Sequence, residues 1–421
     1  MTARATSLLE AIFGESFRRD FDVRLWDGTT LPSTTGRTDF TFIVNSPGAL
    51  RSAFTPPLET HAGAAFISGI IDIDGDLPEA IARINDASNA RTALQKARIG
   101  LMLLRLPREA RPEPPGAQLH GKRHSRERDR AAISYHYDHP VAFYRAFLDS
   151  DMVYSCAYYD DGISDVDRAQ QAKLHYVLDK LRLEPGMSFL DIGCGWGSLV
   201  IAAAKRGAQA LGITLSRVQF DEANRRIAEF GLGDRAKVEF RDYRDLRGLT
   251  FDRIASIGMV EHVGRAMLPT YYSCAYAALR PAGLFLNHGI AEQSPGRKPP
   301  PNPFIERYVF PDGDLVAIGD SLALAERNGF EVRDVENLRE HYARTLRAWV
   351  NNLERNRDEA IAQAGENAYR VWRLYMAGSA VSFDNASIGI YQSLLARPDA
   401  DGSVTIPATR RDLYAPLSSR A

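Results

Sequence analysis

Ser188-Phe-Leu-Asp-Ile-Gly-Cys-Gly-Trp-Gly197 decides the fold class, and the apolar run Ser198-Leu-Val-Ile-Ala-Ala-Ala204 follows it directly. This order predicts a buried strand, a tight turn and then a helix. Glycines at alternate positions let the backbone turn sharply and approach a ligand, and the first amides of the helix point into the same space. Doubly wound α/β sheets bind nucleotide-like ligands at turns of this kind.

The spacing of the glycines separates two classes of ligand. A dinucleotide fingerprint requires glycine at position 198, where this chain has Ser198, and an acidic residue after the second strand. The predicted second strand, 208–213, runs into Thr214-Leu215-Ser216, which contains no carboxylate. The sequence therefore favours S-adenosylmethionine (SAM) over a nicotinamide cofactor. An ordinary βα turn without a ligand is the remaining alternative.

The composition is that of an ordinary globular protein. Of the 421 residues, 45% are hydrophobic and 25% charged, and the formal net charge is −1, so nothing favours nucleic acid as a partner. Cys156, Cys194 and Cys274 form no close pair, which predicts neither a metal site nor a disulfide framework and is typical of a reducing compartment. No signal-peptide core follows Met1, and no apolar run approaches the ~18 residues of a membrane span, so we expect a cytoplasmic protein.

Shifts in composition predict the domain limits. We expect a small mixed N-terminal accessory domain at 1–110, a linker at 111–130, the main domain at 131–397 and a tail at 398–421. In the first domain, 38–44 and 70–77 have the pattern of strands and 79–84 that of a helix. Accessory packing and lipid presentation are both open as its role.

The predicted linker is rich in proline and in basic residues. Its second half, Gly121-Lys-Arg-His-Ser-Arg-Glu-Arg-Asp-Arg130, has five Lys or Arg against two acids. Two interpretations are open. The linker is either solvated, or it contacts anionic lipid head groups, where each basic side chain contributes about 1 kcal/mol.

The main domain alternates between strand-like and helix-like segments, which indicates a mostly parallel sheet with helices on both faces. After the turn we expect helices at 198–206, 217–230 and 268–279 and strands at 208–213, 237–241, 252–258 and 283–288, with a helix at 165–183 before it and a largely helical region after Tyr342. Ligands bind beyond the carboxyl ends of such strands. Glu261, His262 and His288 should therefore meet at one edge of the sheet.

The motifs of this domain resemble the cyclopropane fatty acid synthase family, which includes mycolic acid cyclopropane synthases and unsaturated fatty-acyl methylases. The resemblance covers about 135–397. The matching segments are His136-Tyr-Asp138, Tyr154-Ser-Cys-Ala-Tyr158, Leu190–Gly197, Gly212–Ser216 with Gln219, Gly258-Met-Val-Glu-His-Val-Gly264, His288-Gly-Ile290, Phe304–Pro311 and His341-Tyr342. It implies a class I SAM-dependent methyltransferase, with a Rossmann-like doubly wound α/β sheet and a smaller N-terminal mixed domain.

The family resemblance implies transfer of the SAM methyl group to the cis double bond of an unsaturated phospholipid acyl chain, which gives a cyclopropane ring. The carbocation formed on the way is stabilised by aromatic faces, for which Tyr137, Phe143, Tyr158 and Tyr342 are candidates. A bound bicarbonate ion then removes a proton. The residues that match its family site are Cys156, Glu261, His288, Ile290 (through its backbone) and Tyr342, with Glu261 expected to hold His288 in the required tautomer.

The same matching implies which residues bind SAM. They are Tyr154, Ser155, Asp191, Gly193, Cys194, Gly195, Gly197, Thr214, Leu215, Gln219, Tyr243 and Arg244. Two other activities are open: a fatty-acyl C-methyltransferase that leaves methylene or methyl branches, and a small-molecule N-methyltransferase. We expect peripheral association with the membrane surface, no metal and no nucleic acid, and a homodimer is an open alternative.

Overall fold

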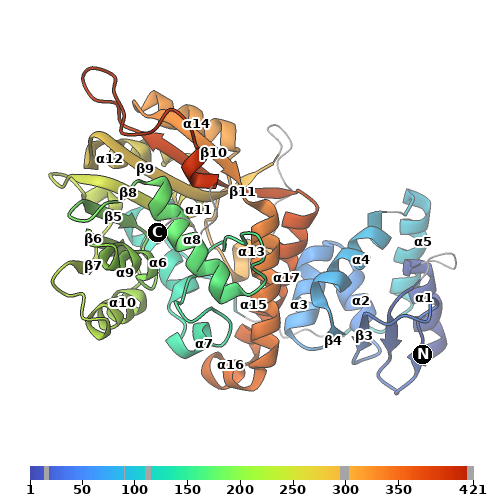
Figure 1. Cartoon of the computed structure of the whole chain (residues 1–421). Helices are drawn as coiled ribbons and strands as arrows, with labels where there is room; N and C mark the ends of the chain where they lie inside the picture. The colour runs from blue at the N-terminus through green and yellow to red at the C-terminus, as the bar shows by residue number, and fades with distance from the viewer. Residues whose placement is uncertain (14–18, 90, 110–114, 294–302, 415–421) are drawn as a thin grey trace. The chain divides into compact units, whose positions relative to one another are not determined.

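We describe the fold from a computed structural model of the whole chain, over residues 1–13, 19–89, 91–109, 115–293 and 303–414 (Figure 1). The chain forms two compact units. The first comprises Met1–Ala117, Pro300–Val309 and Ala360–Ser382, and the second comprises Gln118–Pro299, Phe310–Glu359 and Phe383–Ala421. Two segments inside the predicted main domain therefore group with the N-terminal residues. Composition along the chain does not reveal this grouping, because it depends on tertiary packing.

The first unit contains a four-stranded mixed sheet in the order β2-β1-β3-β4. Its strands are β1 (Asp22–Arg24), β2 (Thr30–Leu31), β3 (Phe40–Val44) and β4 (Ile71–Gly75), and its N-terminal helices are α1 (Thr2–Phe13), α2 (Ala49–Phe54), α3 (Leu58–Ile67), α4 (Leu77–Asn89) and α5 (Ala93–Leu104). Phe40, Phe42 and Val44 alternate with half-buried residues along β3, as a strand with one buried face requires. The strands predicted at 38–44 and 70–77 and the helix at 79–84 are confirmed.

The second unit contains a seven-stranded sheet in the order β10-β11-β9-β8-β5-β6-β7. The strands are β5 (Ser188–Ile192), β6 (Gln209–Thr214), β7 (Ala236–Phe240), β8 (Phe251–Ile257), β9 (Leu279–Glu292), β10 (Glu331–Asn337) and β11 (Ile388–Ala396). β5 to β9 pair in parallel, and β11 runs antiparallel to both β9 and β10. This is the doubly wound α/β sheet that the sequence predicts.

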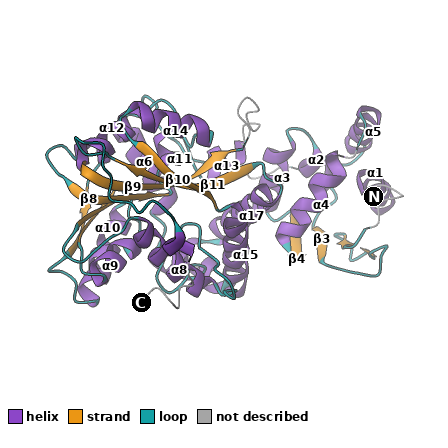
Figure 2. Cartoon of the chain, turned by 45° about the horizontal axis from the view of Figure 1, so that its top comes forward, coloured by secondary structure: helices purple, strands orange, loops and turns teal. Residues whose placement is uncertain are grey.

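Helices cover both faces of this sheet (Figure 2). They include α8 (Val166–Lys180), α9 (Ser198–Lys205), α10 (Arg217–Glu229), α12 (Leu268–Ala278) and α14 (Ile318–Arg327). The side chains of successive strand residues point to opposite faces of the sheet. Phe189 packs in the core under α8, α9 and α10, whereas Leu190 packs in the core under α12 and α14.

The remaining helices are divided between the two units. They are α6 (Arg126–Tyr137), α7 (Val141–Arg145), α11 (Val260–Val263), α13 (Pro303–Tyr308), α15 (Arg339–Arg355), α16 (Arg357–Ala364) and α17 (Glu366–Asp384), with 3₁₀ turns at Tyr243–Asp245 and Arg411–Tyr414. The region after Tyr342, predicted to be largely helical, also contains the strand β11. Among the helices that the structure describes, none combines the length and the apolar character that a membrane span requires.

The predicted linker is partly helical, because α6 begins at Arg126. The Ser125 hydroxyl caps this helix by accepting a hydrogen bond from the backbone N–H of Arg128. Composition alone does not reveal such a capping residue. Three of the five basic side chains here, those of Arg123, Arg126 and Arg128, form ion pairs within the second unit. Arg126 pairs with Asp245 over 2.7 Å, and Arg128 pairs with Asp312 over 2.5 Å.

Candidate functional site

The glycine turn lies at the carboxyl end of β5, where the sequence predicts it. Gly193, Gly195 and Gly197 have φ angles of +79°, +53° and +80°, in the left-handed region that is costly for other residues. The backbone amides of Gly193 and Cys194 both donate to the Ile213 carbonyl oxygen over 3.0 Å, which ties the turn to β6. The helix α9 begins directly after it.

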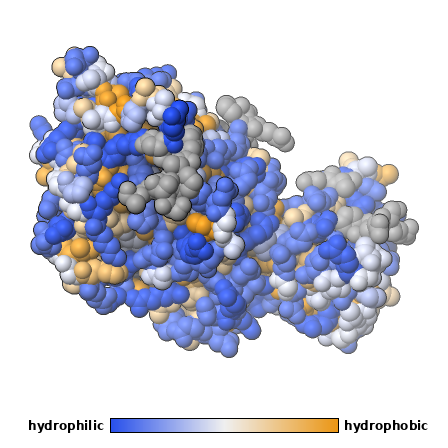
Figure 3. Space-filling model, in the orientation of Figure 1, coloured by the Kyte–Doolittle hydropathy of each residue, from blue (hydrophilic) through white to orange (hydrophobic). Residues whose placement is uncertain are grey.

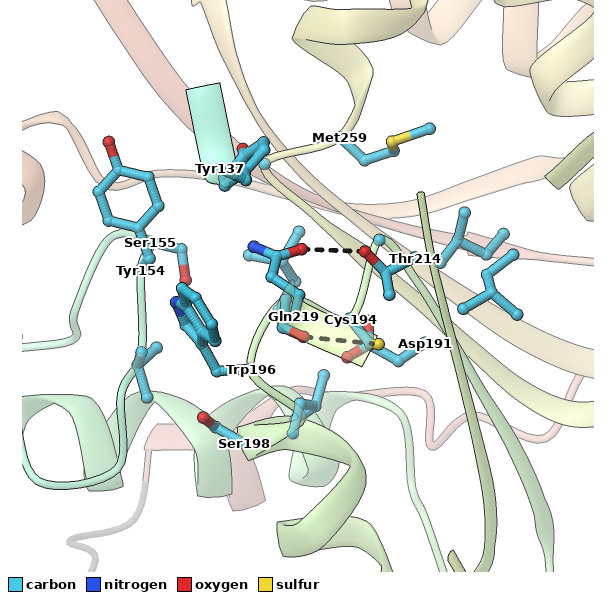
Figure 4. A pocket seen from close by; sticks show the side chains of 18 of the residues that line it. Tyr137, Tyr154, Ser155, Asp191, Cys194, Trp196, Ser198, Thr214, Gln219 and Met259 are labelled. Atoms are coloured by element: carbon cyan, nitrogen blue, oxygen red, sulfur yellow. Dashed lines mark hydrogen bonds between the residues drawn. The ribbon is translucent and has the colours of Figure 1, made fainter. Parts of the chain in front are cut away.

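A pocket lies over this turn, at the carboxyl ends of β5, β6 and β8 (Figure 4). Within it, the Thr214 hydroxyl donates to Gln219 Oε1 over 2.9 Å. All the predicted cofactor-binding residues except Gly197 and Arg244 line it: Tyr154, Ser155, Asp191, Gly193, Cys194, Gly195, Thr214, Leu215, Gln219 and Tyr243. The pocket therefore collects residues that are far apart in the sequence.

Gly197 and Arg244 lie outside the lining of the pocket. A Cβ atom on Gly197 would lie 3.0 Å from Cβ of Ala223, so the glycine lets α9 and α10 approach each other. The Arg244 guanidinium pairs with Asp242 over 2.6 Å and with Asp129 over 3.0 Å. Both residues therefore have structural contacts here, and their contacts with the cofactor stay a prediction.

Lys173 on α8 is a pocket residue to which no sequence motif points. Its ammonium group donates to Ser155 Oγ over 2.9 Å. Burial lowers the pKa of Lys173 to about 8, although the nearby Asp149 carboxylate opposes this shift. Burial also raises the pKa values of the Asp149 and Asp191 carboxyls to about 7. A lysine within an amphipathic helical pattern is typical of a solvated face, so the sequence gives no signal for it.

Aromatic side chains form another wall of the pocket, in which Figure 4 shows Tyr137 and Tyr154. Their ring centroids are 6.2 Å apart in an edge-to-face arrangement. The Tyr137 hydroxyl lies 3.1 Å from Nε2 of His262, a further lining residue. Burial lowers the pKa of His262 to about 4, so its imidazole is neutral near pH 7. This wall can face a positive charge without adding one of its own.

The other aromatic candidates have different surroundings. Phe143 is fully buried and its ring lies 5.9 Å from that of Tyr144. Tyr158 stacks on Tyr176 at 4.3 Å, and Tyr342 lies 8% exposed on α15. Of the four aromatic candidates, Tyr137 is the one that lines the pocket.

A second buried polar group involves the paired strands β9 and β11 and lies outside the lining of this pocket. Glu261 Oε1 accepts the backbone N–H of Ile290 over 2.7 Å, and the Gln392 amide nitrogen lies 3.4 Å from Nδ1 of His288. The other polar atoms, Glu261 Oε2, His288 Nε2 and Gln392 Oε1, are buried without a hydrogen-bond partner. Burial raises the pKa of Glu261 to about 7 and lowers that of His288 well below its usual value.

The contacts in this group correct one expectation. The family resemblance implies that Glu261 holds the His288 tautomer, but Glu261 holds the Ile290 amide, and Gln392 contacts His288 instead. An amide nitrogen only donates, so Nδ1 accepts and the ring proton is on Nε2. No sequence signal identifies Gln392, because it lies on β11, in a region predicted to be helical.

Cys156 is also fully buried. Its Sγ atom lies 3.3 Å from the Ala157 carbonyl oxygen and 3.8 Å from that of Leu338. Burial raises the pKa of the thiol well above its usual value, although the Lys173 ammonium opposes this shift. The side chain is therefore a neutral thiol, which can donate a weak hydrogen bond and is a poor nucleophile.

A comparison with protein families identifies the family to which the chain belongs. Residues 124–393 match the family model described as mycolic acid cyclopropane synthetase. The chain belongs to this family. It is therefore an enzyme, a SAM-dependent methyltransferase of the cyclopropane synthase type, as the motifs predict.

One relative matches nearly the whole chain, and others match about two thirds of it. A probable fatty acid methyltransferase of Pseudomonas putida is 38% identical over 408 residues, which are 95% of this chain and 98% of that protein. The cyclopropane-fatty-acyl-phospholipid synthase of Escherichia coli (strain K12) is 34% identical over 268 residues, 63% of this chain and 68% of that protein. The solved structure of mycolic acid cyclopropane synthase CmaA1, complexed with SAH and CTAB, has 33% identity and a TM-score of 0.59, and it covers 63% of this chain and 98% of that one.

The residues present fit the two small molecules that the resemblance to this synthetase family implies. The pocket fits SAM, because a glycine turn, a helix N-terminus and polar side chains converge there. The second polar group offers donors to a small oxygen anion, because His288 Nε2 and, when the carboxyl group is protonated, Glu261 Oε2 are buried without a partner. Native proteins rarely leave such atoms without a hydrogen bond.

Proposed function

We propose that this enzyme adds the methyl group of SAM to a cis double bond of an unsaturated phospholipid acyl chain and closes a cyclopropane ring. The observation that carries this proposal is the pair of buried polar atoms without hydrogen-bond partners, His288 Nε2 and Glu261 Oε2. Ring closure requires removal of a proton from a carbon atom, and a buried anion site can hold the base. Methylation of a small amine requires no removal of a proton from carbon, so it would not need an anion site at this pair.

The pocket itself would bind SAM and shield the reacting carbon atoms from water. SAM supplies an electrophilic methyl group on a positively charged sulfur atom. An alkene is a weak nucleophile, so holding the two reactants in line contributes most of the rate enhancement. The faces of Tyr137 and Tyr154 would attract the positive charge that develops on the acyl chain, by up to about 2 kcal/mol per ring when water is excluded. The neutral His262 holds the Tyr137 hydroxyl in place.

The residues of the second group would hold a bicarbonate ion, which supplies the base. His288 would donate its Nε2 proton to the anion, whereas the Cys156 thiol already donates to the Ala157 carbonyl oxygen. Glu261 has a pKa raised to about 7, so its Oε2 can either donate or accept at neutral pH. The Ile290 amide is already bonded to Glu261, so we infer that it orients this carboxyl group.

A second candidate product has support from one specific observation. The Pseudomonas putida relative, which matches nearly the whole chain, is named a probable fatty acid methyltransferase. A methylene chain would arise from the same carbocation through a hydride shift and loss of a proton, and a saturated methyl branch would require a separate reductant in addition. The two reactions therefore share all the residues described above and differ in where the base lies.

Mass spectrometry of the lipids from cells that express the protein tests this proposal. A cyclopropane product carries one additional CH2 group and resists ozone, whereas a methylene product has the same mass and is cleaved by ozone. We expect the ozone-resistant product on phospholipid acyl chains. Additional mass on ozone-sensitive chains would favour the second candidate, and unchanged lipids together with SAM turnover on an amine would overturn both.

A further inference from the structure

The helix α5 presents an apolar face to solvent on the first unit. Leu94, Leu101 and Leu104 have exposed fractions of 81%, 64% and 64%. They are spaced at i, i+7 and i+10, which places all three on one face of the helix. The face of the molecule seen in Figure 3 is largely hydrophilic, with apolar residues gathered in small patches. A line of three exposed leucines on one helix is therefore unusual for this surface.

Basic side chains flank these leucines. Residues 91–108 contain Arg91, Lys96, Arg98, Arg105 and Arg108 and no Asp or Glu. At about 100° per residue, Arg98 and Arg105 lie next to the line of leucines. Among the residues that the structure describes, Lys96, Arg98, Arg105 and Arg108 form no salt bridge, whereas Arg126 and Arg128 of the predicted basic linker do. The charges of Lys96, Arg98, Arg105 and Arg108 are therefore available to an external partner.

The helix is fixed in this orientation at both ends. Thr92 and Gln95 form a reciprocal capping box at its N-terminus. The Arg91 guanidinium donates to the Ile12 carbonyl oxygen over 3.2 Å, and at the other end the Arg51 guanidinium donates to the Leu106 carbonyl oxygen over 2.9 Å. The helix is therefore held against the first unit, and its three leucines stay exposed to solvent.

We propose that α5 docks the enzyme on an anionic phospholipid membrane, an inference that rests on the proposed lipid substrate. The leucines would enter the boundary between head groups and acyl chains, while Arg98 and Arg105 would meet lipid phosphates. The same face of a second copy would bring unpaired basic side chains together, so charge favours the membrane over self-association. This assigns membrane contact to α5 rather than to the linker at 111–130.

Flotation of the full-length protein with vesicles tests this assignment. We expect binding to vesicles containing phosphatidylglycerol and little binding to pure phosphatidylcholine. Arg98→Gln/Arg105→Gln should weaken partitioning about 30-fold and reduce its dependence on salt. Leu94→Ser/Leu101→Ser should weaken it about tenfold or more. SAM binding and the melting temperature should stay as in the wild type, since α5 is outside the pocket.

Two matched controls separate docking from general surface properties. Lys122→Gln/Arg247→Gln removes two exposed charges elsewhere, and Phe230→Ser removes an apolar side chain that is 46% exposed on the second unit. Neither control should change flotation by more than about twofold. Equal flotation of the α5 variants and the wild type, or dissociation of a dimer by the leucine variant in sedimentation, would overturn the assignment.

Methyl transfer to acyl chains dispersed in detergent micelles distinguishes failure of this proposal from failure of the proposed function. If wild type and α5 variants methylate micellar lipid equally but also float equally, the docking surface is wrong and the function stands. If flotation depends on α5 but no lipid product forms in micelles or vesicles, the proposed substrate is wrong. The expected result is equal rates in micelles and reduced rates of the α5 variants on vesicles.

Discussion

The Gln392 side-chain amide lies 3.4 Å from Nδ1 of His288, across the antiparallel pairing of β11 with β9. The two residues are direct partners in the strand register, and both are fully buried. The sheet itself therefore fixes this contact, with no contribution from a flexible loop. Because the amide nitrogen donates to Nδ1, the ring proton is on Nε2, the nitrogen without another partner.

Replacing Gln392 tests whether this contact serves the reaction. In Gln392→Leu the imidazole loses its fixed tautomer, and we expect product formation to slow by roughly 10- to 100-fold. The SAM dissociation constant should change less than about twofold, because neither residue lines the SAM pocket. Initial rates with labelled SAM and calorimetric titration measure the two quantities.

Two further variants make this test specific. Gln392→Glu places an acceptor beside Nδ1 and should move the proton away from Nε2, so it should not restore the rate although it keeps the size of the side chain. Tyr391→Phe on the same strand removes a hydroxyl that bonds Gln293 and should have little effect. A normal rate in both Gln392 variants would show that the tautomer does not matter.

The part of the site that sequence could predict is the part with local signals. The glycine turn and the residues that follow parallel strands, such as Thr214, Gln219 and Tyr243, can be placed because alternation of strands and helices brings strand ends together. The family motifs added Tyr154 and Ser155, which line the pocket although they precede the sheet in sequence.

The part that sequence could not predict depends on pairing between distant segments. In the sequence, Lys173 has the pattern of a single charge on an amphipathic helix. Its burial against Ser155 depends on how α8 packs. In the sequence, Gln392 is a polar residue in a region predicted to be helical. Its contact with His288 depends on the register of β11 with β9. The predicted contact of Glu261 with His288 is wrong for the same reason, since the packing of α11 against β9 decides that the carboxyl group accepts the Ile290 amide.

Gly197 is predicted to have a packing role that alanine cannot fill. Gly197→Ala places Cβ 3.0 Å from Cβ of Ala223 in addition to the cost of its left-handed φ of +80°. Gly186→Ala is the matched control, because Gly186 has φ +84° but no atom within 4 Å of the position that its Cβ would occupy. Each should lose about 1–2 kcal/mol of stability from the backbone alone.

The difference between the two glycine variants isolates the close approach of α9 to α10. We expect Gly197→Ala to show a lower melting temperature than Gly186→Ala and, because α9 begins at the turn, a weaker affinity for SAM by about tenfold. Gly186→Ala should bind SAM normally. Equal SAM affinity in both variants would contradict the proposed coupling between this helix contact and the pocket.

Lys173 is predicted to stabilise both the fold and the SAM pocket. Lys173→Met keeps the length of the side chain but removes the buried positive charge beside Asp149 and Asp191. Leaving buried carboxyl groups without this partner should cost about 3–5 kcal/mol, less the amount that they recover by binding protons. Because Ser155 and Asp191 line the pocket, SAM affinity should also fall.

Thermal unfolding and SAM titration measure both effects of the Lys173 variant. Lys122→Met is the control, since Lys122 is an exposed lysine that forms no ion pair among the described residues. It should leave the melting temperature within about 1 °C of the wild type, because single exposed charges contribute little. If Lys173→Met behaved like this control, the buried charge would have no stabilising role.

Glu261 is predicted to make stability depend on pH. Burial raises its pKa from 4.5 to about 7, so between these values the folded protein binds more protons than the unfolded chain. Its contribution to stability is therefore complete below pH 4.5 and is lost as pH rises through 7. Over this range the loss amounts to about 3 kcal/mol for one group. Asp149 and Asp191 add losses of the same sign.

Glu261→Gln removes this one contribution, because an amide does not titrate. We expect the fall in melting temperature between pH 5 and pH 8 to be smaller in this variant than in the wild type by a few °C. The exposed Glu326→Gln on α14 controls for the loss of a carboxyl group and should keep the wild-type slope. Scanning calorimetry without added bicarbonate measures all three slopes, and parallel slopes for Glu261→Gln and the wild type would show that this carboxyl group titrates normally in the folded protein.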